Sequence, residues 1–386
     1  MKSLQYIRDR FFPKPQQLPS GFHTFQSPPE VTPPYRLQLR LENDGTGILV
    51  VNARTVLHLN QTAAEIAYHL ISHDSVEETT RKISKRYNVP RQQALNDVTD
   101  FSERIQTIIE SPTLDPVSFL DFDRVDPYSK ELSAPYRLDC ALTYKTNDDA
   151  PNALPTERVK RELLTEEWKI ILQKTWLAGI PQIVFTGGEP TLRPDLCELI
   201  AVTQNQGQVT GLLTDGKRLS ERDFLHELLQ SGLDHVMINL DPESPQVWEA
   251  IRDVSREDLF LTVHLTLTTH TISEAHVVLE NLQSYMGENR SLSLSVNNAD
   301  LSKQLDAIRN DAIRMGFNMV WDLPVPYSAL NPVSLELAEG ASPVKGAGNA
   351  WLYVEPDGDV LPAQGITTVL GNILTDPWEK IWSNRK

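Results

Sequence analysis

Between residues 135 and 326 the sequence alternates short β-rich runs with amphipathic helical segments, and this alternation constrains the fold more than any other feature. Such a repeat predicts parallel strands with helices outside them, in an open doubly wound sheet or in a barrel. One helix is predicted to begin at Thr165, with Ile170, Ile171 and Leu177 as its buried stripe. The predicted strands are 136–144, 182–186, 209–214, 235–240, 260–268, 291–296 and 319–323.

A smaller module is predicted ahead of this region, at residues 35–112. Alternating apolar residues predict a β-hairpin with strands at 35–42 and 47–52 around Asn43-Asp44-Gly45. Three helices follow in the sequence pattern. The signals for their starts are a capping box at Thr62-x-x-Glu65, a second at Ser75-x-x-Glu78, and Pro90 for the third helix.

Three further segments connect or flank these regions. Residues 1–34 hold seven prolines, which predict an extended arm. Residues 113–134 lack periodicity and predict a linker. Residues 327–386 predict a loop-rich tail with one hairpin around Glu355-Pro356-Asp357-Gly358-Asp359.

Charge and cysteine content exclude several classes of protein. The net charge of −16 argues against a nucleic-acid partner, because phosphate contact needs a basic face. We find no apolar run long enough for a membrane span and no secretory signal. Only two cysteines, Cys140 and Cys197, are present, which excludes a disulfide scaffold and an all-thiolate metal site and predicts a cytoplasmic location.

The sharpest candidate for a binding site is Gly187-Gly188-Glu189-Pro190, directly after the strand at 182–186. Parallel α/β proteins build their sites at the carboxyl ends of strands, and two glycines let a ligand approach the backbone. The Glu189 carboxylate would suit a ligand that bears an ammonium group. The alternative is a tight strand-to-helix turn with a capping glutamate.

Two further strand ends carry polar residues that we expect to converge on the same mouth, namely Thr214, Asp215 and Gly216 after one strand and Asn239 and Asp241 after another. Together they predict a ligand pocket. The nine histidines show no metal-ligand spacing, and no nucleophile–base pair is evident. We therefore predict no metal site and assign no catalytic residue.

These motifs resemble radical S-adenosylmethionine enzymes. Phe185 to Leu196 resembles the family's Gly-Gly-Glu-Pro motif, and Thr214-Asp215-Gly216 resembles its Thr-Asn-Gly, with Asp215 replacing asparagine. Residues 35–110 resemble a PqqD-type module, which recognises leader peptides, and residues 354–373 resemble a SPASM extension. The resemblance implies a partial (β/α)6-type barrel, a winged-helix-like hairpin plus three-helix domain before it, and a SPASM-like extension after it.

The two motifs imply contacts with S-adenosylmethionine for Gly187, Gly188, Glu189, Pro190, Thr214 and Asp215. We add Asn239 and Asp241 to the expected cofactor-binding residues because they follow the third strand end at the same mouth.

The family's cluster-binding cysteines are replaced in this sequence. Thr146, Ala150 and Ala153 stand at the CxxxCxxC spacing, and Ala363 and Lys345 stand at cysteine positions of the tail. A 4Fe–4S cluster needs thiolate ligands, which methyl and hydroxyl groups do not replace. We therefore expect no cofactor to be required, with S-adenosylmethionine retained only weakly.

Three functions remain open from the sequence. The first is a non-catalytic homologue that binds a precursor or leader peptide, or a partner enzyme, in modified-peptide biosynthesis, with the strand at 35–42 as the edge for strand addition. The second is an active or cysteine-substituted radical enzyme that modifies peptides. The third is a cluster-free barrel enzyme in which Glu189, Asp215 and Asp241 bind an amino-acid-like ligand.

Overall fold

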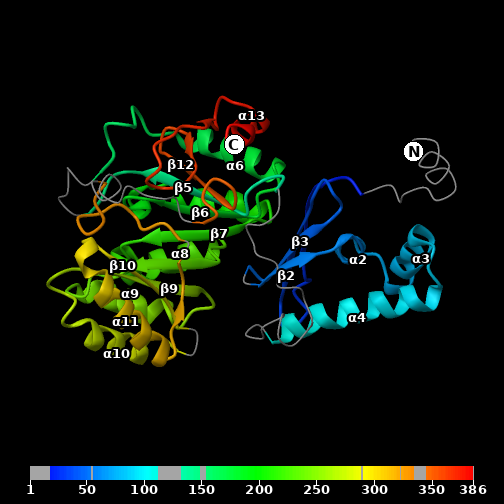
Figure 1. Ribbon diagram of the computed structural model, residues 1–386, viewed down its shortest axis with the longest axis horizontal. Helices are drawn as coiled ribbons and strands as arrows, with labels where there is room; N and C mark the ends of the chain where they lie inside the picture. Colours follow the sequence, from blue (N-terminus) through cyan, green and yellow to red (C-terminus); the bar gives the residue numbers. More distant parts are fainter. Residues whose placement is uncertain are drawn as a thin grey trace. The chain divides into compact units, whose positions relative to one another are not determined.

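The computed structural model describes residues 18–53, 55–111, 132–147, 154–287, 290–321, 323–333 and 345–385. The described chain forms two compact units, one ending at Ser133 and one beginning at Ala134. Each unit is built on its own β-sheet (Figure 1). Most of the predicted linker at 113–134 lies outside the described residues.

The sheet of the first unit has four antiparallel strands in chain order, rather than the two of the predicted hairpin. Its strands are β1 (Gly21–Gln26), β2 (Arg36–Leu41), β3 (Gly47–Val51) and β4 (Thr55–Leu59). Part of the predicted arm forms β1, which pairs with β2, and its Phe25 ring contacts the rings of Tyr35 and His73. Because β2 pairs with β1 on one side and β3 on the other, it is not the open edge that we predicted for peptide addition.

Three helices cover one face of this sheet, namely α2 (Gln61–Ile71), α3 (Val76–Tyr87) and α4 (Arg91–Glu110). The capping box of Ser75 and Glu78 is confirmed at the start of α3. The box predicted at Thr62 is wrong, because Asn60 caps α2 by accepting a hydrogen bond from the Ala63 backbone. Leucines and isoleucines from both layers form a single buried core.

The sheet of the second unit confirms the barrel-type order. Its parallel strands β5 to β11 lie side by side in chain order, whereas in a doubly wound sheet later strands are added on the opposite side of the first strand from the earlier ones. The strands are β5 (Arg137–Thr143), β6 (Gln182–Gly187), β7 (Val209–Thr214), β8 (His235–Asn239), β9 (Phe260–Leu267), β10 (Ser291–Val296) and β11 (Asn318–Met319). The last strand is shorter than predicted, and the sheet remains open at β11.

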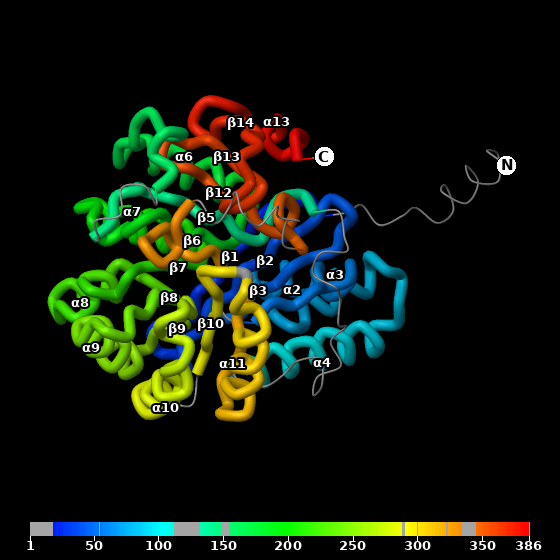
Figure 2. The backbone as a smooth tube through the Cα atoms, turned by 60° about the vertical axis from the view of Figure 1, so that its left-hand side comes forward, coloured from blue at the N-terminus to red at the C-terminus, as the bar shows by residue number. Residues whose placement is uncertain are grey.

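Helices cover the outer side of these strands (Figure 2). They are α6 (Thr165–Leu177), α7 (Leu196–Asn205), α8 (Arg222–Gln230), α9 (Pro245–Val254), α10 (Ala275–Tyr285) and α11 (Ser302–Arg314), with short 3-10 turns η2 (Pro190–Leu192), η3 (Lys217–Ser220) and η4 (Ala299–Leu301). The predicted stripe of α6 is wrong in part, since Ile170 and Leu177 are exposed. Ile171 is buried as predicted, and Trp168 and Leu172 are buried beside it on the same helix.

The tail extends the same sheet on the far side of β5. Strand β12 (Trp351–Val354) pairs parallel with β5, and β13 (Asp359–Leu361) and β14 (Gly371–Asn372) follow antiparallel, so the predicted hairpin is confirmed. Helix α13 (Trp378–Ser383) ends the chain. Among the described residues, no helix combines the length and apolar character needed to cross a bilayer.

Candidate functional site

The carboxyl ends of β6 and β7 are joined by the side chain of Glu189. Its carboxylate accepts hydrogen bonds from the backbone and hydroxyl of Thr191, from Thr214 Oγ1 at 2.9 Å, and from the Asp215 backbone at 2.7 Å. Burial, followed by repulsion from Asp215, raises the pKa of Glu189 to about 8. The side chain therefore ties two strand ends together and is fully engaged within the protein.

Gly187 and Gly188 allow the backbone at the end of β5 to approach the motif, whereas we had predicted that they would allow a ligand to approach it. The Gly188 backbone donates to Thr143 O at 2.9 Å, and the Glu189 backbone donates to Lys145 O at 2.7 Å. A methyl group on Gly187 would lie 2.2 Å from Thr143 O, and one on Gly188 would lie 2.4 Å from Lys145 O. Only glycine therefore allows the end of β5 to lie against this segment.

The second predicted strand end lies beside the first. Asp215 accepts from Asn147 Nδ2 at 2.8 Å and from the Lys217 backbone at 3.0 Å, and its carboxylate lies 3.8 Å from Lys217 Nζ. Its side chain keeps a quarter of its surface exposed. Of the two carboxylates at this edge, Asp215 is thus the one that solvent or a ligand can reach.

The third strand end brings an unpartnered polar atom into the same region of the sheet. Asn239, the last residue of β8, has a buried Oδ1 without a hydrogen-bond partner among the described residues. The Thr186 hydroxyl near the end of β6 is also buried and unpartnered there. Asp241 lies in the loop after β8, where its carboxylate accepts a hydrogen bond from the Glu243 backbone at 3.1 Å.

A row of uncharged polar side chains continues from Asn239 across β9 and β10, and sequence reasoning missed it. Asn239 is in register with His264, and His264 is in register with Ser293. The imidazole contacts Ser293 Oγ at 2.9 Å and Ser295 Oγ at 3.0 Å. Burial lowers the pKa of His264 to about 4, so the ring is neutral at pH 7. The sequence feature that could have revealed this row is the alternation of serine with apolar residues along β10.

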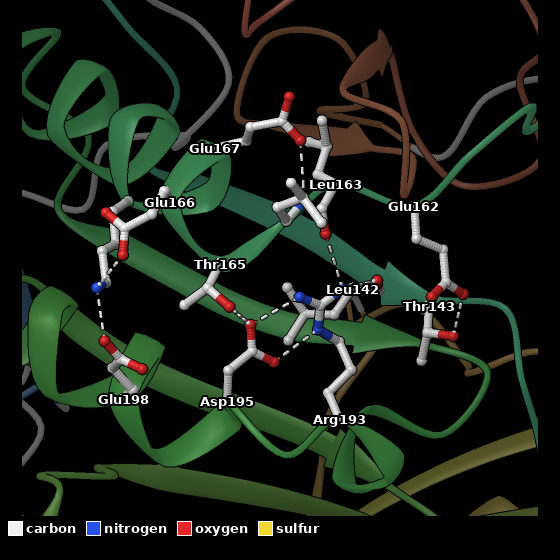
Figure 3. A network of polar contacts seen from close by, with 12 residues as sticks. Leu142, Thr143, Glu162, Leu163, Thr165, Glu166, Glu167, Arg193, Asp195 and Glu198 are labelled. Atoms are coloured by element: carbon white, nitrogen blue, oxygen red, sulfur yellow. Dashed lines mark hydrogen bonds and ion pairs between the residues drawn. The ribbon is translucent and has the colours of Figure 1, made fainter.

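Arg193 is the other site residue that the motif search passed over. Its guanidinium forms two hydrogen bonds with the Asp195 carboxylate, at 2.9 and 2.7 Å, and donates to the backbone oxygens of Leu142 and Leu163 (Figure 3). Thr165 at the start of α6 also donates to Asp195. Arg193 thus holds Leu142 near the end of β5. The following residue, Thr143, accepts the backbone hydrogen bond from Gly188.

The cysteines do not fit a cluster that needs three thiolates. Cys140 lies on β5 with its side chain fully buried in the core under the helices, and Cys197 lies half-buried on α7. Thr146 follows β5 at the first cluster position, whereas Ala150 and Ala153 lie outside the described residues. Within the described ranges, no group of three or more histidine, cysteine and acidic residues could hold a metal ion.

Comparisons with known proteins match both units. Residues 140–310 match the profile described as "Radical SAM superfamily", and residues 47–107 match "Coenzyme PQQ synthesis protein D (PqqD)". A PqqA peptide cyclase of Streptomyces rochei is 29% identical over 287 residues, which are 65% of this chain and 76% of that protein. One from Xanthomonas axonopodis is 26% identical over 291 residues, which are 67% and 74% of the two chains.

Solved structures support the same fold. SuiB of Streptococcus suis bound to S-adenosylmethionine gives a TM-score of 0.56 at 13% identity and covers 93% of this chain and 88% of its own. SuiB bound to its precursor peptide SuiA gives 0.55 at 13% identity, with 89% and 86% covered.

These matches correct our expectation that no cofactor is required. The matched superfamily is defined by S-adenosylmethionine and an iron–sulfur cluster, and SuiB was solved with S-adenosylmethionine bound. The resemblance to radical S-adenosylmethionine enzymes and to PqqD is confirmed, whereas the resemblance of residues 354–373 to a SPASM extension stays a prediction. The first unit is therefore similar to PqqD over residues 47–107, and the second is similar to the radical S-adenosylmethionine superfamily over residues 140–310.

Proposed function

We propose that this protein binds a precursor peptide through its first unit and S-adenosylmethionine in its barrel, without cleaving S-adenosylmethionine reductively. It would thus be a non-catalytic relative within modified-peptide biosynthesis. The observation that carries the S-adenosylmethionine part is the buried, unpartnered Oδ1 of Asn239. A buried acceptor without a partner costs free energy, which a donor on a ligand would recover.

The rest of the strand-end region fits the two ends of this ligand. The row of Asn239, His264 and Ser293 is uncharged and offers hydrogen bonds, which suits the hydroxyl and amino groups of adenosine. The exposed part of the Asp215 carboxylate suits the positive charge of the methionine end. In this proposal Gly187, Gly188, Glu189, Pro190 and Thr214 shape the site, and Asp215, Asn239 and Asp241 face the ligand.

The absence of reductive cleavage is proposed from the thiols. A cluster of this family takes its ligands from cysteine thiolates, and the sequence supplies only Cys140 and Cys197. Burial raises the pKa of both thiols, that of Cys197 to about 11, so both are protonated at neutral pH. Neither residue lies on the segment after β5 where the cluster loop would be.

Peptide binding is proposed at the edge of β4 in the first unit. The sheet order leaves β1 and β4 as its two edges, and only β4 lies within the residues that match PqqD. Val56 on this strand is 52% exposed, so its side chain is accessible to a peptide. A peptide that adds here would gain main-chain hydrogen bonds along β4.

The test of the barrel uses purified full-length protein and S-adenosylmethionine in equilibrium dialysis. We expect saturable binding that Asn239→Ala weakens by about tenfold, the effect of one lost buried hydrogen bond. Ser273→Ala, at an exposed hydroxyl, is the control. After anaerobic treatment with iron, sulfide and dithionite we expect intact S-adenosylmethionine. Formation of 5′-deoxyadenosine would overturn the proposal that the protein is non-catalytic, and absence of binding would overturn the proposal that it binds S-adenosylmethionine.

The test of the first unit measures fluorescence anisotropy of labelled short peptides encoded beside this protein's gene. We expect one of them to bind full-length protein with a dissociation constant in the micromolar range, about −8 kcal/mol. Val56→Pro should weaken binding because proline cannot pair along an edge, whereas Thr24→Pro on the opposite edge should not. Circular dichroism checks that both variants fold. Equal binding by both variants would refute the β4 edge.

A further inference from the structure

The Gly187–Pro190 motif is entirely buried, which is unexpected for a ligand-facing strand end. The end of β5 covers it on one side through the bonds to Gly188 and Glu189. A second segment covers it elsewhere: the Tyr327 backbone donates to Gly187 O at 2.9 Å. We call residues 323–331 the strap.

The strap is held to the rest of the barrel unit at Leu323, Val325 and Tyr327. Leu323 packs against Val184, Leu213 and Met237, which form a small apolar cluster of β6, β7 and β8. Gln364 Nε2 of the tail donates to Val325 O at 2.7 Å, and Asn331 Nδ2 donates to the same oxygen at 2.7 Å from within the strap. The strap itself belongs to no helix or strand.

Tyr327 is the centre of the strap and is 1% exposed. Its ring meets the ring of Tyr144 edge-on, with centroids 5.4 Å apart. The Tyr144 hydroxyl donates to the Glu355 carboxylate at 2.9 Å, and Arg158 forms an ion pair with the same carboxylate at 3.0 Å. The strap is thus held by one backbone bond and by side-chain contacts, whereas the end of β5 is part of the sheet. Of the two covers, the strap is the one that can move without breaking a strand.

We propose that the strap is an autoinhibitory cover, which occupies the carbonyl of Gly187 and must lift before a cationic ligand such as the methionine end of S-adenosylmethionine can reach the β6 strand end. The inference rests on the proposed binding of S-adenosylmethionine. A closed strap lowers the apparent affinity by the fraction of molecules in which it is open. Loosening an anchor of the strap therefore tightens binding without adding any contact to the ligand.

The variant that tests this is Gln364→Ala, which removes the bond from the tail to Val325 O and leaves the residues proposed to face the ligand unchanged. Asn384→Ala is its matched control, because Asn384 Nδ2 makes a bond of the same kind, 2.7 Å to Leu370 O, in the tail. We expect Gln364→Ala to bind S-adenosylmethionine about fivefold more tightly than wild type in equilibrium dialysis, and Asn384→Ala to bind like wild type.

Hydrogen exchange of the wild-type protein gives a second readout. Ligands ordinarily slow exchange where they bind, but here S-adenosylmethionine should speed exchange of the Tyr327 amide by releasing it from Gly187. If wild type binds and neither effect is seen, the strap proposal is overturned while the proposed function stands. If no variant binds S-adenosylmethionine, the proposed function fails and the strap proposal fails with it.

Discussion

Glu189→Gln removes a buried carboxyl group whose titration should dominate how the stability of the barrel depends on pH. The Glu189 side chain is 2% exposed and accepts bonds from Thr191, Thr214 and the Asp215 backbone. Burial is the largest cause of its raised pKa, and the Asp215 charge is the next. These two causes outweigh the donors, which favour the ionised form.

The sign of the effect follows from the two states of the protein. In the unfolded chain this glutamate titrates near 4.5, and in the folded protein it titrates near 8. Between these values the folded state holds a proton that the unfolded state has released, so the free energy of unfolding falls as pH rises. The slope is about 1.4 kcal/mol per pH unit, and its integral is at most about 5 kcal/mol.

Urea unfolding followed by tryptophan fluorescence measures this slope. All seven tryptophans lie beyond residue 134, so the signal reports the barrel unit alone. As pH rises from about 5 to about 8, the free energy of unfolding of the wild type should fall relative to that of Glu189→Gln. Asp215→Asn removes the repelling charge and so should lower the folded-state pKa of Glu189, which makes the slope end at a lower pH than in wild type. A difference that stays constant across this range would refute a protonated Glu189.

Three further predictions concern the same strand ends. Gly187→Ala should destabilise the barrel by about 3 kcal/mol or more in urea unfolding, because its φ of +127° and the Thr143 oxygen leave no place for a methyl group; a loss below about 1 kcal/mol would contradict the close approach. Arg193→Met should cost about 3 kcal/mol by leaving the Asp195 carboxylate buried without its partner, and Arg193→Lys should recover part of this. His264, with a pKa of about 4, should remain neutral above about pH 5 in nitrogen-15 NMR; titration near 6.5 would show that the ring is solvated.

The sequence predicted the fold well where periodicity and burial agree. Strands β6, β7 and β10 lie within a residue of their predicted bounds, because a run of apolar residues between turn signals fits a buried parallel strand and little else. Strand β1 could not be predicted from its own residues. It is stable because its main chain pairs with β2, which local composition does not reveal.

The convergence of the three strand ends was predicted, but the contacts that their residues make were not. Gly187, Asp215 and Asn239 do lie at neighbouring strand ends, because parallel strands end at one edge. The use of each group was not predictable. Glu189 contacts the Asp215 backbone rather than a ligand, and Gly187 makes room for Thr143 rather than for a ligand. Both outcomes depend on contacts between segments that are far apart in the sequence.

The pairing of β1 with β2 has a consequence for how this protein can be shortened. The match to PqqD begins at residue 47, so a fragment cut to the matched range would lose β1 and β2 together and leave β3 with an unpaired side. An exposed apolar edge of this kind invites pairing with other molecules and aggregation. Fragments that begin at about residue 18 keep that side of β3 covered by its natural neighbours.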